Sequence, residues 1–215
     1  MAAFVVNVGV NAAHRVRSPL FTDGSFRLWP IPEQRPWAPP MVRLPEVWGE
    51  RAVHLDPDLE AGTPTYGDNC RWAARAFALR RAGPGDLLLF LARLHPSAEG
   101  SGTPGFYLVG QLEVAETLAD LTADPGAGWW DGNAHVRRSR AGAPWDSFWV
   151  FRGDRASRLY RRAVAFTRTE ADRVFGGGWL WRDSRTELQT LGSYTRTVRR
   201  LEGRGEELVR SLCPS

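Results

Sequence analysis

The residues best able to do chemistry are a histidine and a carboxylate that lie close together in the sequence. His54 and Asp56 flank Leu55. Side chains two residues apart in an extended chain point to the same side, so the imidazole and the carboxylate would face each other. Such a pair can act as a general base, or the carboxylate can merely orient the ring, and Asp56-Pro57-Asp58 also has the composition of a turn. Both interpretations stay open.

Asp23 is a second candidate for acid–base catalysis. It begins the sequence Asp23-Gly24-Ser25, which is typical of a turn whose carboxylate accepts backbone N–H groups. Alternatively, the turn holds Asp23 together with Phe26 and Trp29 at the mouth of a pocket. The two rings would then stack on a nucleobase, and the carboxylate would accept a hydrogen bond from an exocyclic amine.

Tyr66, Asp68, Asn69 and Arg71 form a third candidate group. In one interpretation Asp68 caps the N-terminus of a helix that we predict over residues 69–82. In the other, Tyr66, Asn69 and Arg71 line a binding site at that terminus, where free backbone N–H groups favour a phosphate. The two roles are compatible, and Asp68 remains a candidate catalytic carboxylate.

Composition excludes several classes of mechanism. All 28 basic residues are arginines, so a P-loop lysine, a Schiff-base lysine and a lysine nucleophile are absent. Cys70 and Cys213 are far apart, and no Cys/His cluster typical of zinc binding is present. We therefore expect neither a metal nor a cofactor. The cysteine usage and the lack of an export signal or a long apolar run predict a cytoplasmic protein without membrane contact.

The net charge of +4 is unevenly distributed along the chain. Residues 1–151 contain 14 arginines and 16 acidic residues, a net charge of −2, whereas residues 152–210 contain 14 arginines and 8 acidic residues, a net charge of +6. A basic region with interleaved aromatic residues favours contact with phosphates, although a solvated surface can have the same composition. The candidate phosphate ligands are Arg137, Arg138, Arg161, Arg162, Arg199 and Arg200.

Hydrophobic patterning predicts the elements that must position these residues. The apolar residues 3–10 indicate a buried first strand, and the proline- and aromatic-rich residues 11–50 indicate a long structured loop. Apolar residues at helical spacing predict the helix over 69–82. Residues 87–94 and 105–114 read as two strands of a hairpin. Closer to the C-terminus we expect strands at 147–151, 161–167 and 193–201, a short helix at 170–175 and a terminal helix from about Glu206.

The centre of the chain resembles the PUA-like barrel superfamily, particularly its EVE, ASCH and YTH relatives. The resemblance rests on GPGDLLLFLARL, a glycine-rich loop, and GFYLVGQLEV, in which Gly110-Gln111-Leu112-Glu113-Val114 matches the end of a hairpin strand. It implies an α+β fold: a PUA-like mixed β-barrel with a few flanking helices. We expect a single domain over residues 1–215, with 152–215 as a more basic subregion.

A second resemblance covers nearly the whole chain. The segments SPLFTDGSFRLWPIPE (18–33), AVHLDPDL (52–59), TYGDN (65–69), PGDLLLFLARL (84–94) and GFYLVGQLEV (105–114) together resemble the bacterial and phage family called nucleotide modification associated domain, third type. Two departures stand out: Leu91 occupies a position where the family is expected to have Tyr, and residues 61–64 are inserted. The resemblance implies an association with base-modifying systems.

Three functional hypotheses follow. The first is a protein that recognises a modified nucleobase in DNA or RNA, with Phe26, Trp29, Tyr66, Asn69 and Arg71 binding the base. The second is an enzyme acting on a nucleotide or modified base through Asp23, His54, Asp56 or Asp68. The third is an interaction module. An enzyme is expected to gather carboxylate and histidine in one enclosed pocket, whereas a recognition protein needs an aromatic cleft open to a basic surface. The sequence gives no oligomeric state.

Overall fold

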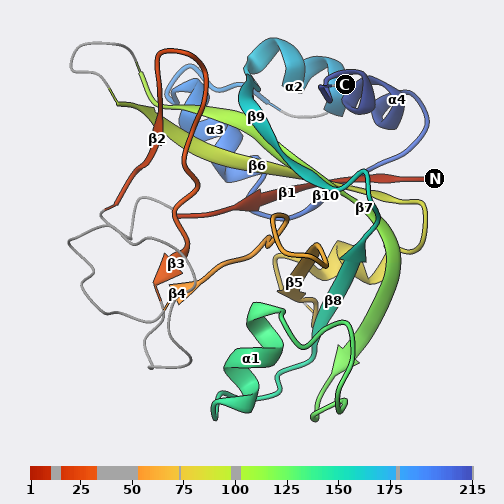
Figure 1. Ribbon diagram of the computed structural model, residues 1–215. Helices are drawn as coiled ribbons and strands as arrows, with labels where there is room; N and C mark the ends of the chain where they lie inside the picture. Colours follow the sequence, from red (N-terminus) through yellow and green to blue (C-terminus); the bar gives the residue numbers. More distant parts are fainter. Residues whose placement is uncertain (11–15, 33–52, 73, 98–102, 178–179, 215) are drawn as a thin grey trace.

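A mixed β-sheet forms the centre of the molecule, as the computed structural model in Figure 1 shows. The structure describes residues 1–10, 16–32, 53–72, 74–97, 103–177 and 180–214. The strands are β1 (Ala3–Val8), β2 (Ser18–Leu20), β3 (Ile31–Pro32), β4 (Val53–His54), β5 (Thr65–Asn69), β6 (Leu87–Pro96), β7 (Gly105–Leu121), β8 (Phe148–Gly153), β9 (Arg158–Ala165) and β10 (Arg199–Leu201). The helices are α1 (Ala134–Arg140), α2 (Arg168–Phe175), α3 (Glu187–Tyr194) and α4 (Arg204–Ser211), with a 3₁₀ helix at Phe77–Arg81.

The main sheet has eight strands in the order β10-β1-β6-β7-β8-β5, with β2 also paired to β6 and β9 to β7. β1 runs parallel to β6, whereas β6 and β7 form an antiparallel hairpin. The 17-residue strand β7 pairs with β6 and β9 along its first part and with β8 along its last part. Strand β7 therefore belongs to both halves of the sheet, the half that contains β6 and β9 and the half that contains β8 and β5.

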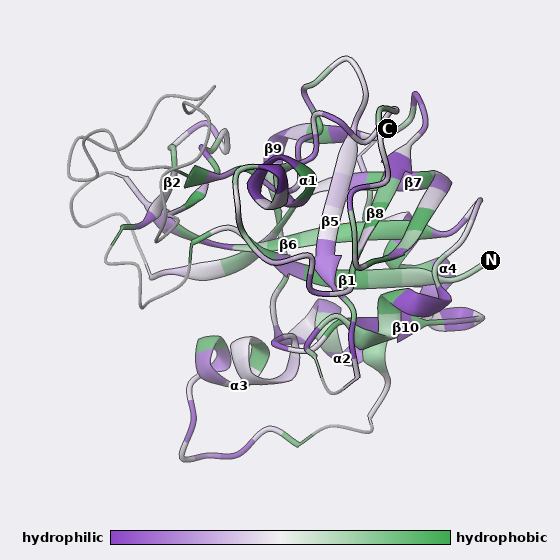
Figure 2. Ribbon diagram, turned by 90° about the horizontal axis from the view of Figure 1, so that it is seen from below, coloured by the Kyte–Doolittle hydropathy of each residue, from purple (hydrophilic) through white to green (hydrophobic). Residues whose placement is uncertain are grey.

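The central strands are buried on both faces, which explains why their sequences are almost continuously apolar. In β6, Leu88, Phe90 and Ala92 pack into one hydrophobic cluster with Tyr66 and Leu79. Leu87, Leu89 and Leu91 pack on the opposite face into a second cluster that includes residues of α2, α3 and α4. In Figure 2 the central strands are coloured hydrophobic along most of their length.

Local sequence signals start two of the helices that cover the sheet. At α2, Thr167 and Glu170 form a capping box, in which each side chain bonds to the backbone of the other. Thr186 and Gln189 do the same at α3. Figure 1 shows α2, α3 and α4 together on one side of the sheet, away from α1 and β5.

Several sequence-based predictions are confirmed. The first strand, the hairpin of β6 and β7, strand β8, strand β9, helix α2 and the terminal helix α4 all lie where the patterns indicated, within a few residues. The proposed long loop is described only in part, because residues 11–15 and 33–52 lie outside the described residues. Within the described part of this segment there are two short strands, β2 and β3.

Two predicted elements are wrong. Residues 69–82 do not form one α-helix. Thr65–Asn69 pairs with β8 as strand β5, and among the described residues of this segment only Phe77–Arg81 is helical, as a 3₁₀ helix. Asp68 is therefore inside a strand and caps no helix. The predicted strand over 193–201 is reduced to Arg199–Leu201, because Ser193 and Tyr194 end helix α3 and residues 195–198 form a turn after it.

The fold is a mixed α+β fold, but the expected barrel does not close. The strand path begins at β10 and ends at β5, and these two strands do not pair with each other in the part of the chain that the structure describes. Both end strands are short: β10 has three residues and leads into α4, and β5 has five. In the described residues, no helix is long and apolar enough to cross a membrane.

Candidate functional site

The segment that follows β4 places His54 and Asp56 on one side of the chain. β4 pairs with β3, with His54 opposite Ile31. His54 and Asp56 line one cavity, whereas Leu55 and Pro57 line another. The alternation that the sequence predicts is therefore present, and the imidazole Nε2 of His54 lies 3.5 Å from Oδ2 of Asp56.

Strand β5 contributes a second carboxylate to the same cavity. Tyr66 and Asp68 are two residues apart in the strand, so their side chains share a face. The Tyr66 hydroxyl donates a hydrogen bond of 2.6 Å to Oδ2 of Asp68, and the Arg75 guanidinium lies 3.5 Å from the same oxygen. The phenol and the guanidinium thus fix the position of Asp68.

Helix α1 brings a second histidine, His135. The helix is anchored to β5 through Asn133, whose side-chain amide donates to Oγ1 of Thr65 and whose side-chain oxygen accepts from the backbone N–H of His135. Nε2 of His135 lies 3.6 Å from Oδ2 of Asp56. Nδ1 of His135 is buried and has no hydrogen-bond partner among the described residues, so the ring meets the cluster through Nε2.

The centre of the site is a buried cluster of His54, Asp56 and His135. The two imidazole rings lie edge to face, with centroids 4.5 Å apart. The backbone N–H of Gly67 donates to both carboxylate oxygens of Asp56, at 3.0 and 2.9 Å. A side chain at position 67 has no room, because a Cβ there would lie 2.7 Å from Cδ2 of His135.

We call the surrounding cavity the carboxylate–histidine pocket. It has a volume of about 210 Å³. Its lining residues are Asn7, Val8, Ile31, His54, Asp56, Tyr66, Gly67, Asp68, Arg75, His135 and Arg138.

Burial controls the charges in this pocket. It raises the pKa of Asp56 to about 6, an effect that the nearby His54 partly opposes. It also lowers the pKa of His135 well below the usual range, helped by the nearby positive charges of His54 and Arg138. The pKa of Tyr66 is raised by burial and by Asp68. The interior therefore disfavours ionisation of these groups.

A second cavity, the arginine cavity, adjoins the first. It has a volume of about 500 Å³, and Asn7 and Arg75 line both cavities. The described residues that line it include three arginines and no carboxylate: Asn7, Gly9, Val10, Arg75, Arg93, Phe106, Leu188, Gln189, Gly192 and Arg196. Nε of Arg93 is buried and has no hydrogen-bond partner in the described part of the chain.

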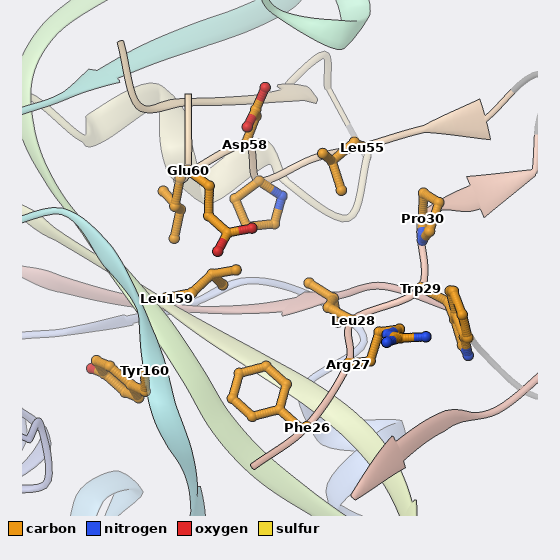
Figure 3. A pocket seen from close by; sticks show the side chains of 12 residues that line it. Phe26, Arg27, Leu28, Trp29, Pro30, Leu55, Asp58, Glu60, Leu159 and Tyr160 are labelled. Atoms are coloured by element: carbon orange, nitrogen blue, oxygen red, sulfur yellow. The ribbon is translucent and has the colours of Figure 1, made fainter. Parts of the chain in front are cut away.

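The third cavity, which we call the aromatic cavity, is shown in Figure 3. It has a volume of about 390 Å³. Phe26, Leu55 and Leu159 line it from three different segments, and the Arg27 guanidinium lies 5.2 Å from the centre of the Trp29 ring at its edge. Apolar walls with a few polar groups are typical of sites for flat organic ligands.

Comparison with known proteins identifies the family. The family model of nucleotide modification associated domain 3 matches residues 3–210. The chain belongs to this family. Searches of curated proteins and of solved structures gave no match.

All three cavities lie within the residues that match nucleotide modification associated domain 3. The resemblance to this family that the sequence indicates is confirmed, and the chain is thereby a domain associated with nucleotide modification systems. The comparisons do not show the PUA-like relationship.

The structure does not bring the five expected base-binding residues into one cavity. Phe26 and Trp29 line the aromatic cavity, whereas Tyr66 is buried in the carboxylate–histidine pocket. Asn69 donates to the backbone oxygen and the carboxylate of Asp146, and Arg71 is exposed. The helix terminus that was expected to gather Tyr66, Asn69 and Arg71 is absent, because these residues lie in or directly after β5.

Of the four candidate catalytic residues, the structure brings His54, Asp56 and Asp68 together and leaves Asp23 apart. Asp23 is exposed and lines none of the three cavities. Its carboxylate accepts hydrogen bonds from the backbone N–H and the hydroxyl of Ser25, which lower its pKa. Asp23 therefore has the turn role that its sequence suggests.

The six candidate phosphate ligands lie on three elements. Arg137 and Arg138 are on α1, and only Arg138 lines one of the three cavities. Arg161 and Arg162 are exposed on β9. On β10, Arg199 donates to the Tyr194 carbonyl and lies over its ring, and Arg200 pairs with Glu202.

Sequence reasoning missed the roles of His135, Arg75, Arg93 and Arg196. His135 is 79 residues from Asp56, and its arginine-rich neighbourhood suggested surface contact. A usable signal was present in Asn133, whose type is favoured as a helix N-cap and which fixes where α1 starts. For the arginines, the sequence carries no signal, because the pairing of β1 with β6 creates their cavity.

The structure also brings together potential metal ligands where the sequence indicated none. His54, Asp56 and His135 each offer one ligand atom, and the three atoms lie within 4.8 Å of one another. Neutral imidazole and carboxylate are ligands for divalent transition metals. The cluster can therefore act through proton transfer or through an ion.

Proposed function

We propose that this chain is an enzyme acting on a nucleotide or a modified nucleobase, with its reaction centre in the carboxylate–histidine pocket. One observation carries the proposal: three separate segments bring four buried residues to a single cavity, namely His54, Asp56, Asp68 and His135. Burying such groups destabilises a fold unless they are paired, so their convergence in a cavity is typical of a catalytic site. The family's association with nucleotide modification supports the substrate class.

Proton transfer is the chemistry that these side chains offer. Asp68, held by Tyr66 and Arg75, is the proton acceptor that we assign to the substrate side of the pocket. Asp56, whose pKa burial raises to about 6 and which lies 3.5 Å from His54, can take up or release a proton near neutral pH. Because the chain contains no lysine, carboxylate and imidazole are our candidates for proton transfer.

The neighbouring arginine cavity would bind the phosphate of a nucleotide. Three arginines without a carboxylate among them attract an anion, and guanidinium groups match the geometry of phosphate. Arg75 faces both the arginine cavity and Asp68, so a bound phosphate would lie beside the reaction centre. The base or the ribose would then extend towards His54 and Asp56.

The proposal is tested by measuring whether the purified chain converts a nucleotide into a product. The purified chain would be incubated with nucleoside monophosphates and triphosphates that carry unmodified and modified bases, and the products would be followed by liquid chromatography and mass spectrometry. A change of mass or retention that depends on the protein is the expected result. If no nucleotide, nucleoside or oligonucleotide is converted, the proposal is wrong.

Removing the arginines of the arginine cavity is expected to weaken the recognition of phosphorylated substrate. Arg93→Ala and Arg196→Ala should each raise KM for a nucleotide about tenfold or more, since a charge-assisted hydrogen bond contributes about 1.5–3 kcal/mol. KM for the matching nucleoside should not change. Steady-state kinetics on the two substrates measures the difference.

Arg161→Ala is the matched control, because Arg161 is exposed on β9 and lines none of the three cavities. It should leave both KM values at the level of the wild type. An equal rise for nucleotide and nucleoside in the Arg93 variant would contradict phosphate contact, and so would a larger effect of Arg161→Ala.

A second candidate function is recognition of a modified base, which the aromatic cavity favours. Stacking of a base on Trp29 contributes about 1–3 kcal/mol, so Trp29→Leu should weaken oligonucleotide binding about tenfold and remove part of the fluorescence quenching. Trp72→Leu is the control, since Trp72 is 79% exposed and lines none of the described cavities. Titration with short DNA and RNA at low and high salt decides the matter; unchanged binding after Trp29→Leu would exclude this role.

A further inference from the structure

Three potential metal-ligand atoms lie close together in the carboxylate–histidine pocket. Nε2 of His54 and Nε2 of His135 lie 3.5 and 3.6 Å from the same oxygen, Oδ2 of Asp56. All three atoms lie within 4.8 Å of one another. Two histidines from distant parts of the chain thus direct the same ring nitrogen at one carboxylate oxygen.

The separations fit a shared ion better than direct hydrogen bonds. A good hydrogen bond to oxygen has a donor–acceptor distance of about 2.7–3.2 Å. By contrast, ligand atoms that bind one zinc ion tetrahedrally at about 2.0–2.2 Å lie about 3.3–3.6 Å apart. The two measured separations, 3.5 and 3.6 Å, fall in that second range. Octahedral neighbours at the same bond lengths would be closer, at about 3 Å.

The surroundings hold the ligand atoms in place. Gly67 donates its N–H to both oxygens of Asp56, which still leaves lone pairs on Oδ2. Asn133 fixes the start of α1 and with it the position of His135. Hydrogen bonds to a ligating carboxylate, such as those from Gly67 to Asp56, orient metal ligands in known sites.

The electrostatics of the cluster also favours a bound cation. The cluster contains one carboxylate and two imidazoles, and all three residues are buried. A divalent cation would stabilise the carboxylate as an anion and would be coordinated by a ring nitrogen of each neutral imidazole. The charge and the donor atoms of the cluster therefore suit such an ion.

We propose that His54, Asp56 and His135 bind one divalent cation of the zinc class, with a fourth coordination position open to the pocket. Imidazole nitrogen and carboxylate oxygen suit Zn²⁺, and three protein ligands with one open position are typical of catalytic zinc. The role of the ion in turnover rests on the proposed function, but its binding does not. An ion here would activate a water molecule, and Asp68, which lines the same pocket, would remain the proton acceptor.

Metal binding is tested on the full chain without any nucleotide. After treatment with chelator, the protein would be titrated with Zn²⁺ against a chromophoric competitor and, separately, with Co²⁺ while its visible spectrum is recorded. We expect one equivalent per chain, with the intense bands of four-coordinate Co²⁺. X-ray absorption of the zinc-loaded wild type should show nitrogen and oxygen ligands with imidazole scattering.

The variants His54→Ala and His135→Ala should each lower Zn²⁺ affinity at least tenfold, whereas His95→Ala, a histidine outside the pocket, should not. Circular dichroism shows whether each variant folds, and the spectra of the wild type test the site even if a variant does not fold.

The metal-binding inference is overturned if the wild type does not bind zinc stoichiometrically, or if the X-ray absorption spectrum shows a sulfur ligand. Bound zinc without turnover would overturn only the enzyme proposal, and turnover that persists in metal-free protein would overturn only the ion's role in it.

Discussion

Asp56→Asn is expected to lower kcat by about 100-fold or more while leaving the protein folded. Asp56 lies 3.5 Å from His54 and 3.6 Å from His135, so the charge of its carboxylate is needed whether the cluster acts by proton transfer or by binding an ion. The amide keeps the size of the side chain and one oxygen to accept from Gly67. Since burial raises the pKa of Asp56, folding disfavours its charged form, and a neutral replacement should cost little stability.

The measurements are kcat on the converted nucleotide, Zn²⁺ affinity and the midpoint of thermal unfolding. Asp23→Asn is the matched control, because Asp23 is a carboxylate in an exposed turn. It should keep the kcat of the wild type. A kcat for Asp56→Asn close to that of the wild type would show that the reaction centre is elsewhere. Equal losses in both variants would show a general effect on folding.

Gly67→Ala is expected to disrupt the same site by steric means. The added Cβ would lie 2.7 Å from Cδ2 of His135, 2.9 Å from Oδ1 of Asn133 and 3.2 Å from Oδ2 of Asp56. All three neighbours are buried. They have little room to move, so overpacking should lower the free energy of unfolding by about 1–3 kcal/mol. Any shift of His135 or Asp56 would also reduce activity and zinc affinity.

Urea unfolding followed by circular dichroism measures this free energy. Gly62→Ala is the control, because nothing lies within 4 Å of a Cβ at that position. Its midpoint should match that of the wild type. If Gly67→Ala unfolds at the same urea concentration as Gly62→Ala and keeps its activity, then the close packing around Gly67 does not matter for the site.

The sequence predicts the centre of the fold well because that part depends on local patterns. The apolar runs at 87–94 and 105–114 are long enough for strands and are separated by a turn-rich loop, so a hairpin follows directly. The predicted helix at 69–82 failed for the opposite reason. Its spacing of Trp72, Ala76 and Leu79 is helical, but the pairing of β5 with β8 determines the local structure up to Asn69, and Trp72 ends up 79% exposed.

The residues of the candidate site likewise fall into those that local sequence patterns predict and those that depend on contacts between distant segments. His54 and Asp56 are found from sequence because their contact depends only on the alternation of side chains along an extended chain. Asp68 is found as a candidate, although for a helix that does not form. The type of Asn133 indicates where α1 starts, but the contact of His135 with this cluster is missed, because it depends on a hydrogen bond between Asn133 and Thr65, residues 68 positions apart.

A single stretch of chain separates the carboxylate–histidine pocket from the aromatic cavity. Along it, His54 and Asp56 line the first, and Leu55 and Pro57 line the second. A ligand that displaces the backbone at Leu55 or Pro57 would also move His54 and Asp56, which the same stretch carries. Occupancy of the aromatic cavity would then be coupled to the geometry of the carboxylate–histidine pocket, and such coupling is reciprocal. A molecule bound in the aromatic cavity would in this way act on the proposed reaction centre without touching it.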